Sequence, residues 1–159
     1  MPDIKAIFSG RPWWMNAMMV FCAYMTFIYM PFDIFYKPVA EDEEVWFGYM
    51  LRGWAAKATA PVHWLIYGFG FYGYVKMKAW MHPWAALYIF QIAIAMVVWS
   101  FLYGDVSSVP RMLVAGLIGL AFVALGVATW RAKPLFAGED VQPAADAAPG
   151  EDKPDSEDS

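Results

Sequence analysis

Charged residues are missing from the middle of four long stretches of this sequence. The stretches contain no Asp, Glu, Lys or Arg away from their ends, and they span residues 12–30, 59–77, 84–103 and 112–130. Charged residues make up 16% of the chain, whereas soluble domains contain about 25%. A helix of about 20 apolar residues crosses a hydrocarbon core of about 30 Å. We therefore expect an all-α integral membrane protein with four transmembrane helices.

The charged residues Asp, Glu, Lys and Arg are absent at membrane depth, and few other polar side chains are present there. Pumps and coupled carriers use charged groups inside the membrane, so their absence argues against transport by this chain alone. The few polar side chains within the stretches are expected to hydrogen-bond between helices. They are Asn16, Thr26, Gln91 and Ser100. Cys22 is the only cysteine, which excludes a disulfide within the chain.

The motifs of the common enzyme classes are also missing. None of the serines has the glycine-flanked context of a nucleophile elbow. Gly68, Gly70 and Gly73 match the spacing of a dinucleotide-binding loop, but no strand precedes them and they lie in an apolar stretch. We expect a protein that is not an enzyme and that has no nucleic-acid partner.

Charge divides the chain into three parts. We expect an N-terminal surface segment at 1–11, a membrane domain at 12–136 and an acidic disordered tail at 137–159. The net charge is −4, but residues 139–159 hold eight acids and one base, so the rest of the chain carries +3. The tail has too few apolar residues to fold alone, and it could dock on a basic partner by charge.

The segment between the first two apolar stretches contains an acidic run, Glu41 to Glu44. After it, apolar residues recur at positions 46, 47, 50, 51 and 54, which is helical spacing. Acidic residues in a first turn complement the helix dipole. We therefore predict an amphipathic helix at about 42–57 that lies in the membrane interface.

Basic residues indicate the orientation. Four crossings place both termini on one side of the membrane, together with six lysines and arginines, whereas four lie on the other side. Because cytoplasmic loops are enriched in basic residues, we predict a bacterial inner-membrane protein with both termini in the cytoplasm.

His63 is the candidate cofactor-binding residue. An imidazole near one end of a membrane helix, beside Trp64 and Tyr67, can ligate a haem or chlorophyll, or contact a quinone. His82 lies at the other end of the same stretch, about 28 Å away for a straight helix, so a bis-histidine haem within the chain is not expected. The acids at 41–44, with Asp33, would need three converging ligands to hold a metal, and their spacing does not require it. No metal and no resident cofactor are therefore predicted as the leading case.

Several residues are candidates for contact with lipid or with a partner protein. Methionines crowd the first apolar stretch and adapt to irregular surfaces, and small residues permit close helix approach. The remaining candidates are Trp46, Phe47, Met50, Trp54, Gly68, Gly70, Gly73, Gly116 and Gly119.

These observations lead to three functional hypotheses. The first is a non-catalytic accessory or assembly subunit of a larger membrane complex, with lipids and other integral membrane proteins as partners. The second is a haem-, chlorophyll- or quinone-binding subunit of an electron-transfer or light-harvesting system that uses His63. The third is a membrane enzyme or lipid-binding protein that uses the acidic loop.

Overall fold

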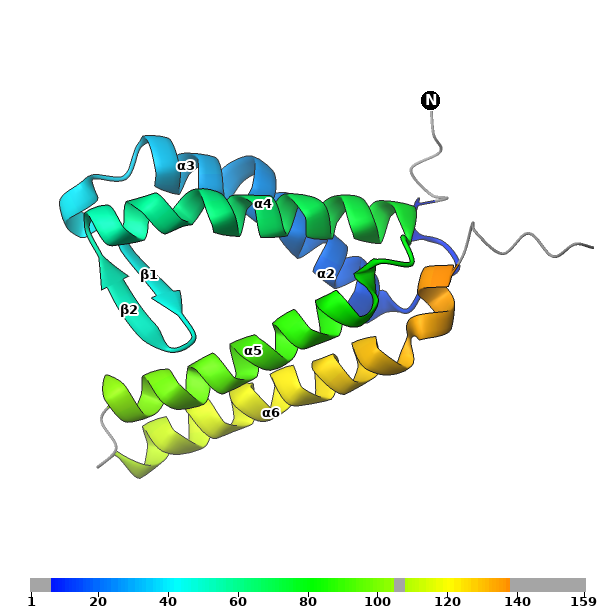
Figure 1. Cartoon of the computed structure of the whole chain (residues 1–159). Coiled ribbons are helices and arrows are strands. Elements are labelled where there is room, and N and C mark those ends of the chain that lie inside the picture. Colours follow the sequence, from blue (N-terminus) through cyan, green and yellow to red (C-terminus); the bar gives the residue numbers. More distant parts are fainter. Residues whose placement is uncertain (1–6, 105–107, 138–159) are drawn as a thin grey trace, which may run out of the picture.

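The computed structural model describes residues 7–104 and 108–137, which form a helical bundle with one short hairpin (Figure 1). The expected surface segment at 1–11 is described from residue 7 onward. The expected acidic tail, apart from residue 137, lies outside the described residues, as does the turn at 105–107.

The first long helix extends past the point where the sequence predicted its end. It consists of α2 (Trp13–Tyr24), a π-helical turn (Met25–Tyr29) and α3 (Met30–Phe35). We expected the helix to stop at residue 30 because Pro31 follows. Instead, Pro31 occupies the start of α3, directly after the π-helical turn, where the backbone is wider and the missing N–H is tolerated. Asp33 is consequently a helix residue and is buried.

The predicted interfacial helix at 42–57 is wrong for most of its length. Strands β1 (Glu43–Trp46) and β2 (Tyr49–Arg52) form an antiparallel hairpin in which Trp46 pairs with Tyr49. The two turn residues, Phe47 and Gly48, have φ values of 51° and 91°. Two positive φ values in a two-residue loop match the twist of a tight hairpin. The glycine supplies the second of them at little cost.

Three further helices complete the fold: α4 (Trp54–Lys76), α5 (Met81–Leu102) and α6 (Val109–Arg131). They match the stretches predicted at 59–77, 84–103 and 112–130, although α4 begins five residues early and includes Pro61. Among the described residues, three helices are long and apolar enough to cross a membrane, and they are Trp13–Phe35, Met81–Leu102 and Val109–Arg131. The chain is therefore a helical membrane protein, and α4 is not among those three.

The helices form two packed pairs that diverge from one end (Figure 1). The first helix packs on α4, and α5 packs on α6 along its length. A short turn at 77–80 joins α4 to α5 at the narrow end, and the hairpin occupies the wide end.

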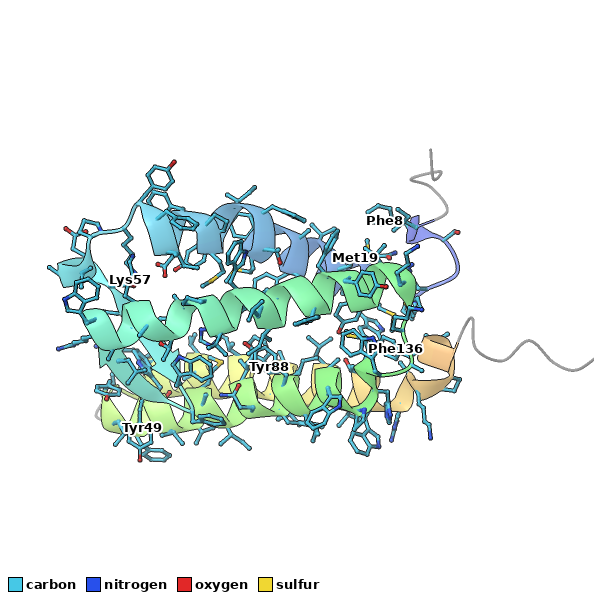
Figure 2. All side chains as sticks on the ribbon, turned by 45° about the horizontal axis from the view of Figure 1, so that its top comes forward. Phe8, Met19, Tyr49, Lys57, Tyr88 and Phe136 are labelled. Carbon is cyan, nitrogen blue, oxygen red and sulfur yellow. The ribbon has the colours of Figure 1, made fainter. Side chains whose placement is uncertain are left out.

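The core lies at the narrow end, where the short helix Lys133–Ala137 also packs. Phe136 is 1% exposed and lies near Tyr74, with ring centroids 6.0 Å apart. Met15 and Met19 are buried in the same cluster, and Figure 2 shows Met19 and Phe136 at this end and Lys57 and Tyr49 at the other. These two methionines therefore fill the core, whereas the sequence predicted that the methionines of this helix contact a partner protein or lipid.

Candidate functional site

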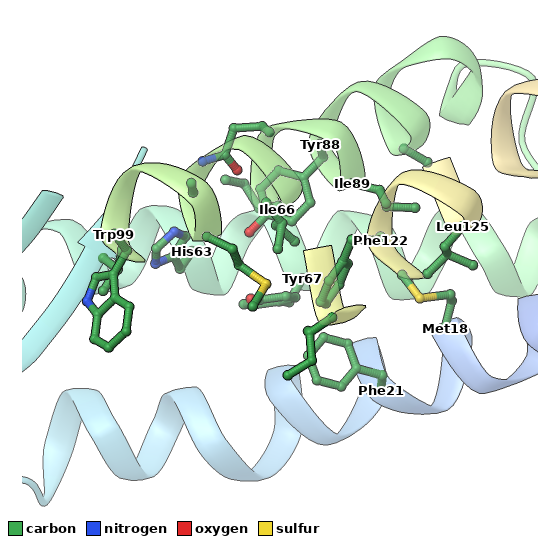
Figure 3. Close-up of a pocket in the computed structure, with 18 of the residues that line it drawn as sticks. Met18, Phe21, His63, Ile66, Tyr67, Tyr88, Ile89, Trp99, Phe122 and Leu125 are labelled. Atoms are coloured by element: carbon green, nitrogen blue, oxygen red, sulfur yellow. The ribbon is translucent and has the colours of Figure 1, made fainter. Parts of the chain in front are cut away.

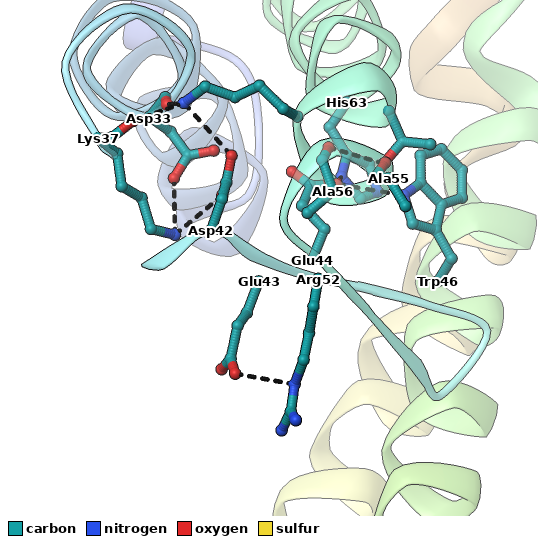
Figure 4. A network of polar contacts seen from close by, with 12 residues as sticks. Asp33, Lys37, Asp42, Glu43, Glu44, Trp46, Arg52, Ala55, Ala56 and His63 are labelled. Atoms are coloured by element: carbon teal, nitrogen blue, oxygen red, sulfur yellow. Dashed lines mark hydrogen bonds and ion pairs between the residues drawn. The ribbon is translucent and has the colours of Figure 1, made fainter. Parts of the chain in front are cut away.

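Four charged side chains meet at the wide end, where the chain passes from α3 to the hairpin (Figure 4). Lys37 Nζ lies 3.1 Å from a carboxylate oxygen of Asp33 and 3.1 Å from one of Asp42. Lys57 Nζ lies 3.3 Å from the other Asp42 oxygen. Lys57 also donates hydrogen bonds to the carbonyl oxygens of Asp33 and Lys37. Two lysines and two aspartates thus form a balanced network that ties the loop to α3 and α4.

The network buries one carboxylate completely, since the Asp42 side chain has no exposed surface. Burial lowers the pKa of Lys37, but hydrogen bonds to Asp42 and Asp33, and the negative charges of both, outweigh it and raise that pKa above the usual lysine value. A buried charge is stable only when it is paired. Two of the acids at this end are therefore engaged in holding the structure together.

Glu44 and Trp46 project from one face of β1 towards His63 of α4 (Figure 4). A Glu44 carboxylate oxygen lies 2.6 Å from His63 Nδ1, and Trp46 Nε1 donates to that same oxygen at 3.1 Å. The Trp46 and His63 rings are stacked, with centroids 4.1 Å apart and planes 6° apart. The side chains of His63 and Glu44 are 16% and 8% exposed. The imidazole is thus held on one edge and one face.

His63 lines a large, partly open cavity whose lining residues come mainly from α2, α4, α5 and α6 (Figure 3). Its volume is about 1510 Å³, which exceeds the 300–1,000 Å³ usual for small-molecule sites by roughly a half or more. The lining is mostly aliphatic and aromatic, and its polar groups near the middle of the bundle include Tyr67, Tyr88 and Gln91. Phe21 and Phe69 line the cavity and are exposed, so the cavity is open between the helices.

Aromatic rings crowd around the histidine. The Tyr67 ring lies 6.3 Å from His63 and meets Tyr88 edge to face at 6.4 Å. Phe21 from α2 meets Tyr67 in the same geometry at 5.8 Å. Edge-to-face contacts are favourable because the positive ring edge faces the negative ring centre. These contacts fix the walls next to the imidazole.

Close packing at both ends determines how far α4 and α5 separate. At the wide end, a Cβ on Gly48 would lie 2.5 Å from Val98 Cβ, so the hairpin tip touches α5 directly. The Met50 amide also donates to the Tyr103 hydroxyl at 3.3 Å. At the narrow end, a Cβ on Gly73 would overlap with the Met81 sulfur. The hairpin thus holds α4 and α5 apart at the wide end, whereas the turn at 77–80 keeps them close at the narrow end.

Compared with protein-family models, curated proteins and solved structures, the chain gives no match. No family is therefore shown.

The predicted contact residues fall into three groups. Trp46 belongs to the site, whereas Phe47 and Trp54 are 60% and 77% exposed, and Met50 lies on β2 at half burial. Gly68 and Gly70 lie against the first helix, where a Cβ would approach Thr26 and Cys22, and Gly73 lies at the narrow end. Gly116 and Gly119 line a separate groove of about 380 Å³ between α5 and α6, where a Cβ on either would meet nothing within 4 Å.

The other candidate residues are placed as follows. His82 lies outside the cavity, with Nε2 3.2 Å from the carbonyl oxygen of Trp130. Glu43 pairs with Arg52 at 3.1 Å on the exposed face of the hairpin. Within residues 7–104 and 108–137, no three His, Cys, Asp or Glu side chains are grouped as a metal site would require.

Sequence reasoning missed Glu44 as the partner of His63, because the pairing depends on the hairpin register. The Phe47-Gly48 pair between two short apolar runs is the signal that could have revealed it. Tyr67 and Gln91 were noticed in the sequence, but only the packing of α4 against α5 places them with Tyr88 around one cavity.

Proposed function

We propose that this protein binds an uncharged, lipophilic, ring-bearing molecule in the cavity between its helix pairs. The observation that carries this proposal is the cavity itself, of about 1510 Å³, with an oriented imidazole in an otherwise mainly apolar wall. Ligand sites typically combine apolar walls with a few placed polar groups. The proposal develops the second hypothesis drawn from the sequence, with His63 as the ligand-contacting residue.

The charge of the wall favours a neutral ligand. Among the described residues that line the cavity, Arg111 is the only one with a permanent charge. An anionic ligand would lose its hydration on entering and would gain little in return. A neutral molecule dissolved in lipid avoids this cost, and the opening between the helices beside Phe21 and Phe69 gives it a route from the bilayer.

The proposed topology has four crossings, with α4 as the second. The first helix, α4, α5 and α6 alternate in direction, so α4 returns the chain across the thickness that the first helix crosses (Figure 1). Its 23 residues, at about 1.5 Å each, give about 34 Å, enough for a hydrocarbon core. Both termini then share one side with Arg11, Lys76 and Arg131, which favours the cytoplasmic side of a bacterial inner membrane.

The proposal is tested by filling the cavity. Ile92 lines it, whereas Ile94, two residues further along α5, lies outside it and is 62% exposed. The full chain and its Ile92→Trp and Ile94→Trp variants are purified in mild detergent, and the retained lipophilic molecules are extracted and quantified by mass spectrometry. We expect one molecular class to be retained by the parent chain and by Ile94→Trp, and to be reduced at least several-fold in Ile92→Trp. Equal retention by both variants contradicts the proposal.

An accessory role in a membrane complex is a second candidate. The observation that favours it is the groove between α5 and α6, where Ala93, Gly116 and Gly119 leave room for an approaching helix. Purification from native membranes should then yield a stoichiometric integral-membrane partner that Gly116→Trp removes. Leu117→Trp, at an exposed position of α6 that does not line the groove, should not remove it. A chain that purifies alone at full yield argues against this role.

A further inference from the structure

We infer that His63 Nε2 is the hydrogen-bond acceptor of the cavity and that it binds a phenolic hydroxyl, so that the ligand is a lipophilic hydroquinone and not the oxidised quinone. The inference rests on the proposed function, because it names the class of molecule that occupies the same cavity. It concerns binding only and assigns no electron transfer to the protein.

The first step is the position of the imidazole proton. An ionised carboxylate can accept hydrogen bonds but cannot donate them. Glu44 accepts from Trp46 Nε1 at 3.1 Å and lies 2.6 Å from His63 Nδ1 through the same oxygen. The geometry therefore places the proton of a neutral imidazole on Nδ1 and leaves the lone pair on Nε2.

The second step is the direction of the free nitrogen. The Trp46 ring covers one face of the imidazole and Glu44 holds its Nδ1 edge, so the ring cannot turn without breaking both contacts. His63 is a lining residue of the cavity, and no hydrogen bond from the described parts of the chain is made to its Nε2. A ligand that carries a hydrogen-bond donor therefore finds an acceptor on His63.

The third step is the class of donor. Rings surround the imidazole, with Tyr67 and Tyr88 in edge-to-face contact and Trp99 in the wall (Figure 3), and such walls accept a flat ring. A phenolic hydroxyl joins a donor to a flat ring. A haem would also use Nε2, but its carboxylates need cations. Arg111, the only permanent cation among the described lining residues, already takes part in another interaction.

The test compares ligands that share a tetramethyl-substituted six-membered ring and differ in whether they carry a hydrogen-bond donor. The full chain in lipid nanodiscs is titrated by calorimetry, under anaerobic conditions, with tetramethylhydroquinone, tetramethylbenzoquinone and the dimethyl ether of the hydroquinone. The hydroquinone donates, whereas the other two only accept. We expect the hydroquinone to bind roughly 3- to 10-fold more tightly than either, which is the gain from one net hydrogen bond.

Matched variants assign the preference to His63. His63→Phe keeps a ring and removes the acceptor, so the three affinities should become equal, whereas His82→Phe makes the same change outside the cavity and should keep the preference. In Glu44→Gln the new amide can either accept a hydrogen bond from Nδ1 or donate one to it, so the tautomer of His63 is no longer fixed. The ratio of hydroquinone affinity to quinone affinity should therefore fall towards unity. Partial unfolding of a variant would weaken the binding of all three ligands together and would leave the ratio of their affinities unchanged.

The outcomes separate this inference from the proposed function. Equal affinities in the parent chain, or tighter binding of the quinone, overturn the inference while leaving a lipophilic site in place. A visible absorption band in the purified chain that His63→Phe removes overturns it in favour of a metal macrocycle. If none of the three probes binds and Ile92→Trp also retains its lipophilic molecules, both the inference and the proposed function are wrong.

Discussion

The indole of Trp46 lies parallel to the imidazole of His63, with ring centroids 4.1 Å apart and planes 6° apart. One ring belongs to the hairpin and the other to α4, so the stack joins the only sheet among the described residues to the helical bundle. Stability at the wide end of the molecule should therefore depend on this contact.

Replacing Trp46 by Leu removes both the stack and the hydrogen bond to Glu44. An aromatic pair contributes about 0.5–1.5 kcal/mol beyond its buried area, and a hydrogen bond adds about 1 kcal/mol. We expect the free energy of unfolding to fall by about 1–3 kcal/mol, measured by thermal or denaturant unfolding in detergent. Trp54→Leu is the control, since Trp54 is 77% exposed and its loss should change stability by less than about 0.5 kcal/mol. Equal losses in the two variants would show that the stack is not the stabilising contact.

Two glycines should respond to alanine with opposite signs. At Gly73 an added Cβ overlaps with the Met81 sulfur and approaches the Trp80 ring, whereas at Gly116 it meets nothing within 4 Å. Gly73→Ala should lower the free energy of unfolding by about 1–3 kcal/mol through overpacking. Gly116→Ala should raise it by up to about 1 kcal/mol, because alanine favours the helix. The same unfolding assay measures both, and a stabilising Gly73→Ala would contradict the close approach at the narrow end.

The buried and exposed ion pairs of the loop should differ in strength. Lys57 pairs with Asp42, whose side chain is fully buried, whereas the side chains of Arg52 and Glu43 are 71% and 51% exposed. Lys57→Met leaves a buried carboxylate with one partner fewer, and we expect a loss of about 3 kcal/mol. Arg52→Met should cost less than about 1 kcal/mol. Unfolding of both variants at low and high salt provides the check, since salt should change the contribution of the exposed pair alone.

Stability at the wide end should fall in strongly alkaline solution. The pKa of Lys37 is raised in the folded protein, chiefly because hydrogen bonds to Asp42 and Asp33 outweigh the effect of burial. Folding therefore favours the protonated ammonium. Its stabilising contribution is complete below the unfolded value of about 10.4 and is lost as the pH rises through the raised value.

The measurement is the unfolding temperature between about pH 8 and pH 11.5. The unfolding temperature should stay constant at the lower pH values. It should decrease above the ordinary lysine pKa, where Lys37 begins to lose its proton. Lys37→Arg is the control, because a guanidinium stays charged throughout this range, and its decline should be shallower. A parent chain and a Lys37→Arg variant with the same profile would contradict the assignment to Lys37.

Hydropathy predicted the helices that meet apolar surroundings along most of their length. The stretches at 84–103 and 112–130 correspond to Met81–Leu102 and Val109–Arg131, because the length of an apolar run is a local property of the sequence. The position at which the first helix ends, in contrast, does not follow from a local property of the sequence. Whether Pro31 stops the helix depends on the π-helical turn before it, and nothing in the residue types requires that turn.

The hairpin was mistaken for a helix because two patterns share the same residues. Positions 46, 47, 50, 51 and 54 fit a helical stripe, yet Glu44 and Trp46 also fit one face of a strand. The turn at Phe47 and Gly48 decides between the two patterns, and the close contact of Glu44 with His63 Nδ1 favours the strand.

The candidate site was therefore only half predictable. The imidazole of His63 was recognised from its place in an apolar stretch whose middle contains no Asp, Glu, Lys or Arg. Its carboxylate partner and the cavity beside it arise from contacts between segments far apart in the chain, so no single window of sequence contains them.

The hairpin tip sets the spacing of two helices from a position near their ends. Gly48 abuts Val98, so any shift of the strands away from α5 changes how far α4 and α5 stand apart. If the cavity holds a lipophilic molecule as proposed, a displacement of the hairpin would change the width of the opening beside His63. The affinity of the site would then depend on a segment that does not belong to the helices.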